Sequence, residues 1–144
     1  MARTSTYLNF PGNTEEAFNF YKSVFGGEFG GNGIARFGDI PTSIEMPPLS
    51  DDDKQLIMHI ELAITGGHIL MGTDASESMG FKVIFGNNIY INLEPDTRTE
   101  TERLFQLLSK GGKIEQELQD MFWGAYYGSC TDQFGVSWMF NCSN

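Results

Sequence analysis

Two side chains capable of chemistry, His59 and Glu61, lie two positions apart in the segment QLIMHIELAIT, residues 55–65. In a strand, positions i and i+2 point to the same face, so both side chains can reach one ligand. An imidazole held by a carboxylate is typical of a general base. A metal site needs three or four ligands, and this pair supplies two. In the alternative interpretation, the two side chains satisfy only each other or water.

The segment that carries the pair is the clearest predicted strand of the chain. Its even positions, from Met58 to Ile64, are apolar and predict a face packed under a helix. Its odd positions carry His59 and Glu61 and predict the opposite face. Gly66-Gly67 turns the chain into a partner strand over residues 68–73.

The same order of elements occurs twice. The first half reads as a strand (7–10), a helix capped by Asn13 or Thr14 and stopped by Gly26-Gly27, and strands over 28–37, 55–65 and 68–73. The second half reads as a strand (88–93), a helix from Pro95-Asp96 to Gly111-Gly112, and strands over 113–118 and within 119–141. Residues 38–54 form a loop, and residues 74–87 join the halves. The repetition predicts an α+β fold of two βαβββ modules, about 1–75 and 86–144, within one domain spanning 1–144.

Strand alternation sorts the remaining side chains into two groups. Those expected under the helices are Ile60, Leu62, Ile64, Ile89, Ile91, Leu93, Val136, Trp138 and Phe140, facing Ala17, Phe20, Tyr21, Val24, Phe25, Leu104, Leu107 and Leu108. Those expected to line a concave surface include Ser5, Tyr7, Asn9, Met71, Asn88, Tyr90 and Met139. A mixed polar and aromatic lining is typical of a small-molecule pocket. Alternatively, these are ordinary solvent-facing residues of a half-buried sheet.

Aromatic residues of the closing segment add candidates for ligand binding. Trp123 precedes Gly124 and is predicted at a rim, and one of Tyr126 and Tyr127 must face the concave side. Such rings stack planar or cationic ligands, although they can equally fill a core. The predicted ligand-binding set is Tyr7, Asn9, Asn88, Tyr90, Trp123, Tyr127 and Met139.

Composition limits the classes of partner. A net charge of −10 and a pI near 4.4 disfavour nucleic acid, and no apolar run approaches the roughly 20 residues that span a bilayer. The N-terminus lacks the apolar core of a signal peptide, so we expect a cytoplasmic protein. Cys130 and Cys142 are expected to be reduced, although a bridge between the two arms of the last hairpin is geometrically conceivable.

Several motifs together resemble a known family. They are Tyr7-Leu8-Asn9-Phe10 with Gly12-Asn13, Glu16-Ala17, Phe20-Tyr21, Phe25-Gly26-Gly27-Glu28, His59 followed by Asp74, Phe122-Trp123-Gly124, Tyr127-Gly128, and Asp132-x-Phe134-Gly135-Val136-x-Trp138. The chain resembles the vicinal oxygen chelate superfamily, which includes glyoxalase I, extradiol dioxygenases and bleomycin-resistance proteins. Within it, the chain is most similar to PhnB-like (YjdN-like) proteins. The resemblance implies a glyoxalase/bleomycin-resistance-like fold, with a cupped mixed sheet, and a homodimer.

The resemblance also bears on metal chemistry. Metal-dependent members place one ligand on each of four strands, and those positions map near Ser5, Met71, Asn88 and Met139. None is a good ligand for a divalent metal, so no metal is predicted at the standard positions, and a non-standard one stays possible. PhnB-like proteins are often labelled ubiquinone-pathway methyltransferases, but no Gly-rich loop follows the first strand, and we predict no cofactor.

Three hypotheses follow. The first is a homodimer that binds a small molecule in the cup without the standard metal. The second is an enzyme of the lyase, isomerase or glyoxalase type, with His59 as base supported by Glu61 and by Tyr90 or Tyr127. The third is a purely structural dimerisation module.

Overall fold

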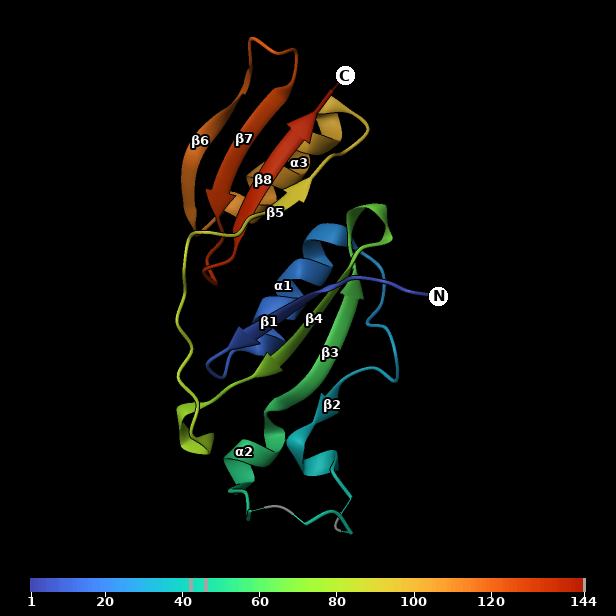
Figure 1. The fold of residues 1–144 in the computed structure, drawn as a ribbon, viewed down its shortest axis with the longest axis vertical. Helices are drawn as coiled ribbons and strands as arrows, with labels where there is room; N and C mark the ends of the chain where they lie inside the picture. The colour runs from blue at the N-terminus through green and yellow to red at the C-terminus, as the bar shows by residue number, and fades with distance from the viewer. Residues whose placement is uncertain (42, 46, 144) are drawn as a thin grey trace. The chain divides into compact units, whose positions relative to one another are not determined.

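The computed structural model describes residues 1–41, 43–45 and 47–143, in two compact units, Met1–Val83 and Ile84–Asn144 (Figure 1). The first unit contains β1 (Thr6–Phe10), α1 (Thr14–Phe25), β2 (Ala35–Arg36), α2 (Asp51–Gln55), β3 (Ile57–Ala63) and β4 (Ile69–Asp74). The second contains β5 (Ile91–Leu93), α3 (Arg98–Ser109), β6 (Lys113–Asp120), β7 (Tyr126–Thr131) and β8 (Ser137–Cys142). Three short 3₁₀ turns lie at Phe37–Asp39, Thr65–Gly67 and Glu77–Met79.

Both units connect their strands in the same way. The sheet orders are β1-β4-β3-β2 and β5-β8-β7-β6, so in each unit the first strand lies beside the fourth. That pair is parallel, and the other neighbours are antiparallel. The predicted α+β fold with two βαβββ modules is therefore confirmed. The closing strand β8 is central in its sheet, between β5 and β7.

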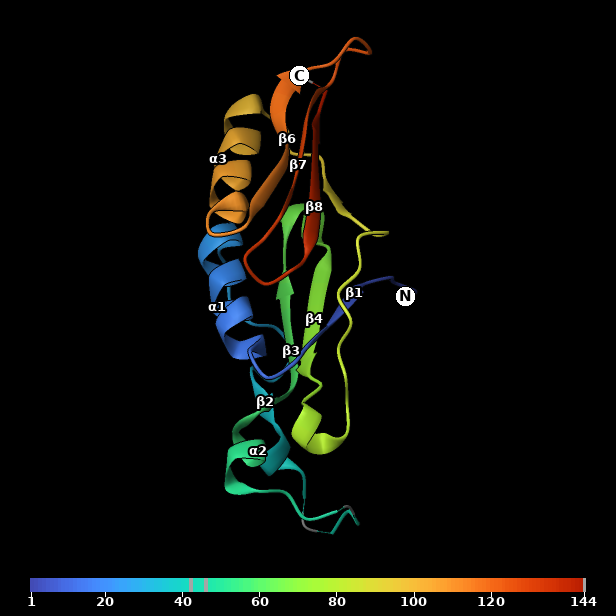
Figure 2. The same cartoon turned by 90° about the vertical axis from the view of Figure 1, so that its left-hand side faces the viewer.

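Helix α1 covers one face of the first sheet (Figure 2). Its buried residues are Thr14, Ala17, Phe18, Tyr21 and Val24, and the buried strand residues include Ile60, Leu62 and Leu70. Gly72 of β4 makes this contact close, since a Cβ there would lie 2.5 Å from Phe18 Cε1. The predicted apolar stripe of this helix did not include Phe18. The i, i+3, i+4, i+7 and i+8 spacing that starts at Ala17 selects Phe20 and Phe25 instead.

The start of α1 is held by a residue distant in the sequence. Asn13 occupies the N-cap position, as one alternative predicted, but its side chain makes no capping hydrogen bond. Instead, the buried carboxylate of Asp74 accepts hydrogen bonds from the backbone N–H of Thr14 (3.0 Å) and of Ile57 (2.8 Å). One side chain of β4 therefore fixes both the helix and the neighbouring strand.

Helix α3 covers the second sheet in the same manner (Figure 2). Phe105 packs against Phe140 of β8, with ring centroids 5.2 Å apart, and Trp138 is fully buried. Leu107, which was predicted to pack inward, is 36% exposed, because the buried stripe runs through Thr101, Leu104, Phe105 and Leu108.

Several predicted strands are shorter than expected. The strand predicted over 28–37 is reduced to β2 and an isolated bridge at Phe29, because Gly31 and Gly33 adopt left-handed backbone angles. The strand predicted over 88–93 begins only at Ile91, and Ile89 is 76% exposed rather than packed under a helix. The loop predicted over 38–54 includes α2, whose first turn is Asp51–Asp53 with Ser50 as N-cap.

The short β2 is fastened by a charged side chain. Arg36 donates to both carboxylate oxygens of Glu15 on α1, at 3.0 and 2.8 Å, and to the backbone oxygen of Gln55 at 2.7 Å. The hydrogen bonds from Arg36 hold the pKa of Glu15 below its ordinary value. None of the described helices is long and apolar enough to cross a membrane.

Candidate functional site

His59 and Glu61 lie together on the face of the first sheet that α1 does not cover. Both alternate along β3 with the buried Ile60 and Leu62. His59 Nε2 and Glu61 Oε2 are 3.0 Å apart, and the side chains are 38% and 18% exposed. The Tyr7 ring, on β1, has its centroid 6.1 Å from that of His59. The imidazole is therefore held by a carboxylate while still open to a ligand.

A glycine-rich turn passes close to Glu61. The Gly30 N–H donates to the Glu61 backbone oxygen at 2.9 Å, and a Cβ on Gly30 would lie 3.2 Å from Glu61 Oε1. The absence of a side chain at Gly30 leaves room for the carboxylate beside His59. The sequence alone does not place Gly30 beside Glu61, because the contact joins segments that are distant in the chain.

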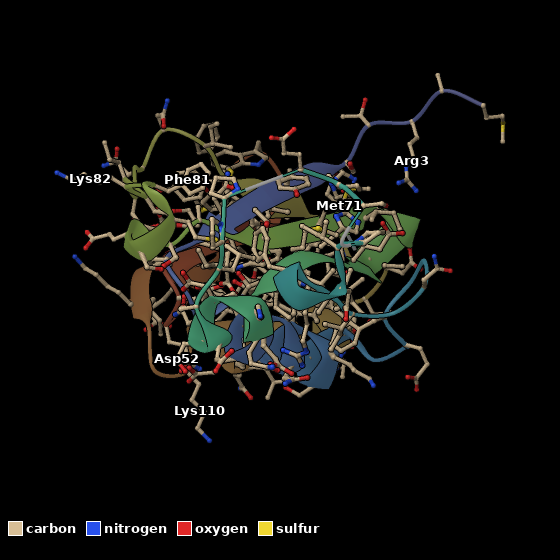
Figure 3. All side chains as sticks on the ribbon, turned by 90° about the horizontal axis from the view of Figure 1, so that it is seen from below. Arg3, Asp52, Met71, Phe81, Lys82 and Lys110 are labelled. Atoms are coloured by element: carbon tan, nitrogen blue, oxygen red, sulfur yellow. The ribbon has the colours of Figure 1, made fainter. Side chains whose placement is uncertain are left out.

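Ser5 and Met71, two of the four positions mapped from the metal-dependent members of the superfamily, lie in contact on this face. Met71 of β4 is in register with Tyr7 on one side and Glu61 on the other. The Ser5 hydroxyl donates to the Met71 sulfur at 3.7 Å. Figure 3 shows Met71 on the side of β4 opposite α1. Asn9 is exposed on the same strand as Tyr7. The face is mixed polar, aromatic and thioether in character.

In the second module, Tyr90 is bound by a carboxylate that sequence reasoning missed. Its hydroxyl donates to both oxygens of Glu115 on β6, at 3.0 and 3.1 Å. This hydrogen bond, with the nearby charge of Glu115, raises the pKa of Tyr90 above its ordinary value. The sequence places Glu115 in the predicted strand over 113–118, but no sequence pattern indicates that it contacts Tyr90.

The paired tyrosines of β7 take opposite sides of the sheet. The Tyr126 hydroxyl donates to Glu102 of α3 at 3.4 Å, so Tyr126 lies on the helix side and Tyr127 on the other. Trp123 is 55% exposed, and its ring centroid lies 6.2 Å from that of Tyr127. Phe122, at the same hairpin tip, is 98% exposed.

The remaining predicted residues of the second module are less closely associated. Met139 of β8 is half-buried, in register with Asn92 and Ser129 on the helix-free face. Asn88 is exposed in the irregular segment before β5 and lies outside any strand. Tyr90, Tyr127, Trp123 and Met139 are therefore candidates for one aromatic surface, and Asn88 stays a separate, exposed candidate.

The described His, Cys, Asp and Glu side chains form no cluster that could bind a metal ion. Within residues 1–41, 43–45 and 47–143, no three His, Cys, Asp or Glu side chains are placed to hold one metal ion. The four mapped positions carry Ser5, Met71, Asn88 and Met139, whose hydroxyl, amide and thioether groups are poor ligands for a borderline divalent metal. The residues present do not fit the metal that the superfamily implies.

The two cysteines are buried and are not joined in a disulfide. In the register of β7 and β8, Cys130 lies opposite Trp138 and Cys142 lies opposite Tyr126, so the two are not cross-strand partners. The conceivable bridge is therefore not formed. Burial raises the pKa of the Cys130 thiol to about 12, which keeps it protonated and unreactive.

Comparison with known proteins identifies the family. The family model described as 3-demethylubiquinone-9 3-methyltransferase matches residues 2–140. Protein YjdN of Escherichia coli (strain K12) is 31% identical over 142 residues, which cover 95% of this chain and 92% of YjdN. The chain belongs to this PhnB-like (YjdN-like) family.

Solved structures support the fold of this PhnB-like protein. Protein PA1353 from Pseudomonas aeruginosa is 35% identical, with a TM-score of 0.80 and coverage of 99% of this chain and 98% of that one. A glyoxylase/bleomycin resistance protein/dioxygenase domain from Frankia sp. EAN1pec is 9% identical, with a TM-score of 0.65 and coverage of 100% and 98%. The PhnB-like chain therefore has the fold of the vicinal oxygen chelate superfamily.

Proposed function

We propose that this PhnB-like protein binds a small organic molecule on the helix-free faces of its sheets, without the standard metal of the superfamily. The observation that carries the proposal is the content of those faces. The first carries Tyr7, His59 and Glu61, and the second carries Tyr90, Tyr127 and Trp123. Exposed aromatic rings beside hydrogen-bonding groups are suited to a planar ligand.

Thermal-shift screening with a broad panel of metabolites tests this proposal. A ligand that raises the melting temperature of the native protein should have a reduced effect on Tyr7→Ala or Trp123→Ala. The control is Leu107→Ala, which also truncates an exposed side chain but on the helix side. If the hits shift all variants equally, or no compound shifts the native protein, binding on these faces is refuted.

The second candidate function is catalysis with His59 as general base. The separation of 3.0 Å between His59 Nε2 and Glu61 Oε2 favours it, because the carboxylate can orient the ring and stabilise the imidazolium that forms. Glyoxalase-type reactions, and many lyase and isomerase reactions, begin with removal of a proton by a base. For any turnover found, His59→Ala should abolish it and Glu61→Gln should reduce it. Unchanged turnover in His59→Ala would remove His59 from this role.

The methyltransferase activity in the family description does not fit the end of the first strand. The loop Pro11-Gly12-Asn13 is short and contains a single glycine. The backbone N–H of Thr14, at the start of α1, already donates to Asp74. The protein itself therefore occupies one of the backbone donors at this helix end, which argues against a cofactor there.

We also propose that two chains associate, as in the homodimers that the family resemblance implies. Sedimentation of the purified protein should then give twice the mass of the 16.1 kDa chain.

A further inference from the structure

Helix α3 and the edge strand β6 form a groove on the helix-covered side of the second sheet. Its volume is about 360 Å³, within the size range of small-molecule sites. β6 is the edge strand of its sheet (Figure 1), so no further strand of that sheet borders the outer side of the groove. Because Tyr126 lines the groove and Tyr127 faces the other way, the groove is separate from the surface discussed above.

Both walls of the groove combine apolar and acidic side chains. Phe105, Ile114 and Leu118 supply apolar surface, and Ile114 is 41% exposed despite being aliphatic. Glu102 and Glu117, one on each wall, supply carboxylates. No lysine or arginine is among the described residues that line the groove.

The Tyr126 hydroxyl helps to place one of these carboxylates. It donates to Glu102 Oε1 at 3.4 Å, and its ring is covered by the Arg98 guanidinium at 4.3 Å from the centroid. Arg98 in turn pairs with Asp120 at the end of β6. The end of the groove near Tyr126 is thereby ordered without a ligand.

We propose that this groove binds an amphipathic organic cation, an ammonium group carried on a short aliphatic chain. The aliphatic part would lie on Phe105, Ile114 and Leu118, and the ammonium group would lie between Glu102 and Glu117. Apolar surface favours a hydrophobic body, and two carboxylates without a lining cation favour a positive head. The net charge of −10 attracts the same ligands at long range. An acid of the same shape would be repelled.

The test compares three probes of one length on the intact ¹⁵N-labelled chain: hexylammonium, 1-hexanol and hexanoate. Amide chemical shifts should report saturable binding of hexylammonium at Ser109, Ile114 and Leu118, weaker binding of hexanol, and none of hexanoate. The double variant Glu102→Gln with Glu117→Gln should weaken hexylammonium binding about tenfold, the effect of losing two exposed ion pairs.

The matched control is Glu45→Gln with Glu77→Gln, which removes the same net charge from exposed positions of the first module. It should leave hexylammonium affinity within about twofold of native, because neither residue lines the groove and charges on exposed side chains are screened by salt. Well-dispersed amide spectra establish that each variant is folded. Equal binding of hexanol and hexylammonium, shifts confined to other residues, or equal effects of the two double variants would each overturn the proposal. An absence of saturable shifts would overturn it as well.

Discussion

Asp132 is a single buried carboxylate that holds a turn and the central strand together. One oxygen accepts from the backbone N–H of Phe134 (2.8 Å) and Val136 (3.0 Å), and the other accepts from Trp138 Nε1 (2.9 Å). Asp132→Ala deprives these buried donors of their acceptor, so we expect the free energy of unfolding in urea to fall by about 3 kcal/mol. Asp52→Ala, on the exposed surface of α2, should change it by less than about 0.5 kcal/mol. Equal losses would contradict the assigned role.

The Tyr90–Glu115 hydrogen bond makes a prediction about titration. Glu115→Gln removes the charged acceptor, so the pKa of Tyr90 should fall toward its ordinary value, measured from the tyrosinate absorbance or the ring NMR shifts. A raised folded-state pKa contributes stability below the unfolded pKa of about 10, and this contribution is lost as the pH rises through the folded value. Stability near pH 11 should therefore differ less between the native chain and Glu115→Gln than near pH 8. An unchanged titration in the variant would refute the pairing.

For single residues, the sequence predicts the sheet face to which a side chain points better than it predicts the residue that the side chain contacts. His59 and Glu61 could be paired from the sequence, because two positions of one strand share a face. The sequence could not pair Glu115 with Tyr90, or Asp74 with Thr14, because each of these contacts joins elements that are distant in the chain. The groove between α3 and β6 was missed for the same reason.

At the scale of elements, Gly72 sets how closely α1 approaches β4. A methyl group there would lie 2.5 Å from Phe18 Cε1 and 3.1 Å from Thr14 Cγ2. Gly72→Ala should therefore lower the free energy of unfolding by about 1–3 kcal/mol through overpacking.

A double-mutant cycle supplies the control for this prediction. Phe18→Leu alone leaves space in the core, and Phe18→Leu with Gly72→Ala should be less destabilised than the sum of the two single variants. Additive losses would show that the two residues are not packed against each other as described.

The elements predicted correctly are those with strong periodicity. β3, β8 and both long helices alternate or repeat clearly, and the limits of β3 and of the two helices are close to those expected. The predicted strands over 28–37 and 88–93 lacked this support. Gly31 and Gly33 interrupt the first, and Ile89 in the second has no helix above it and is exposed. β2 persists at two residues because Arg36 is anchored on Glu15, an ion pair that no local pattern encodes.

At the scale of the whole molecule, the duplication preserves the scaffold and not the surface chemistry. Both units repeat the strand order and the single covering helix. The helix-free face of the first unit carries the His59–Glu61 pair, and that of the second carries Tyr90, Tyr127 and Trp123. Side chains on a sheet face can change without affecting the core beneath, so two related modules can specialise in different contacts.

The metal content of the purified protein is the corresponding prediction. Because the ligand positions map near Ser5, Met71, Asn88 and Met139, we expect elemental analysis to find well below one divalent metal per chain. Added Ni²⁺ or Zn²⁺ should not raise the melting temperature. A stoichiometric metal would contradict this expectation. His59→Ala and Glu61→Gln would then locate it, since loss of the metal in both variants requires a site built on that pair. Retention in both would place the metal elsewhere.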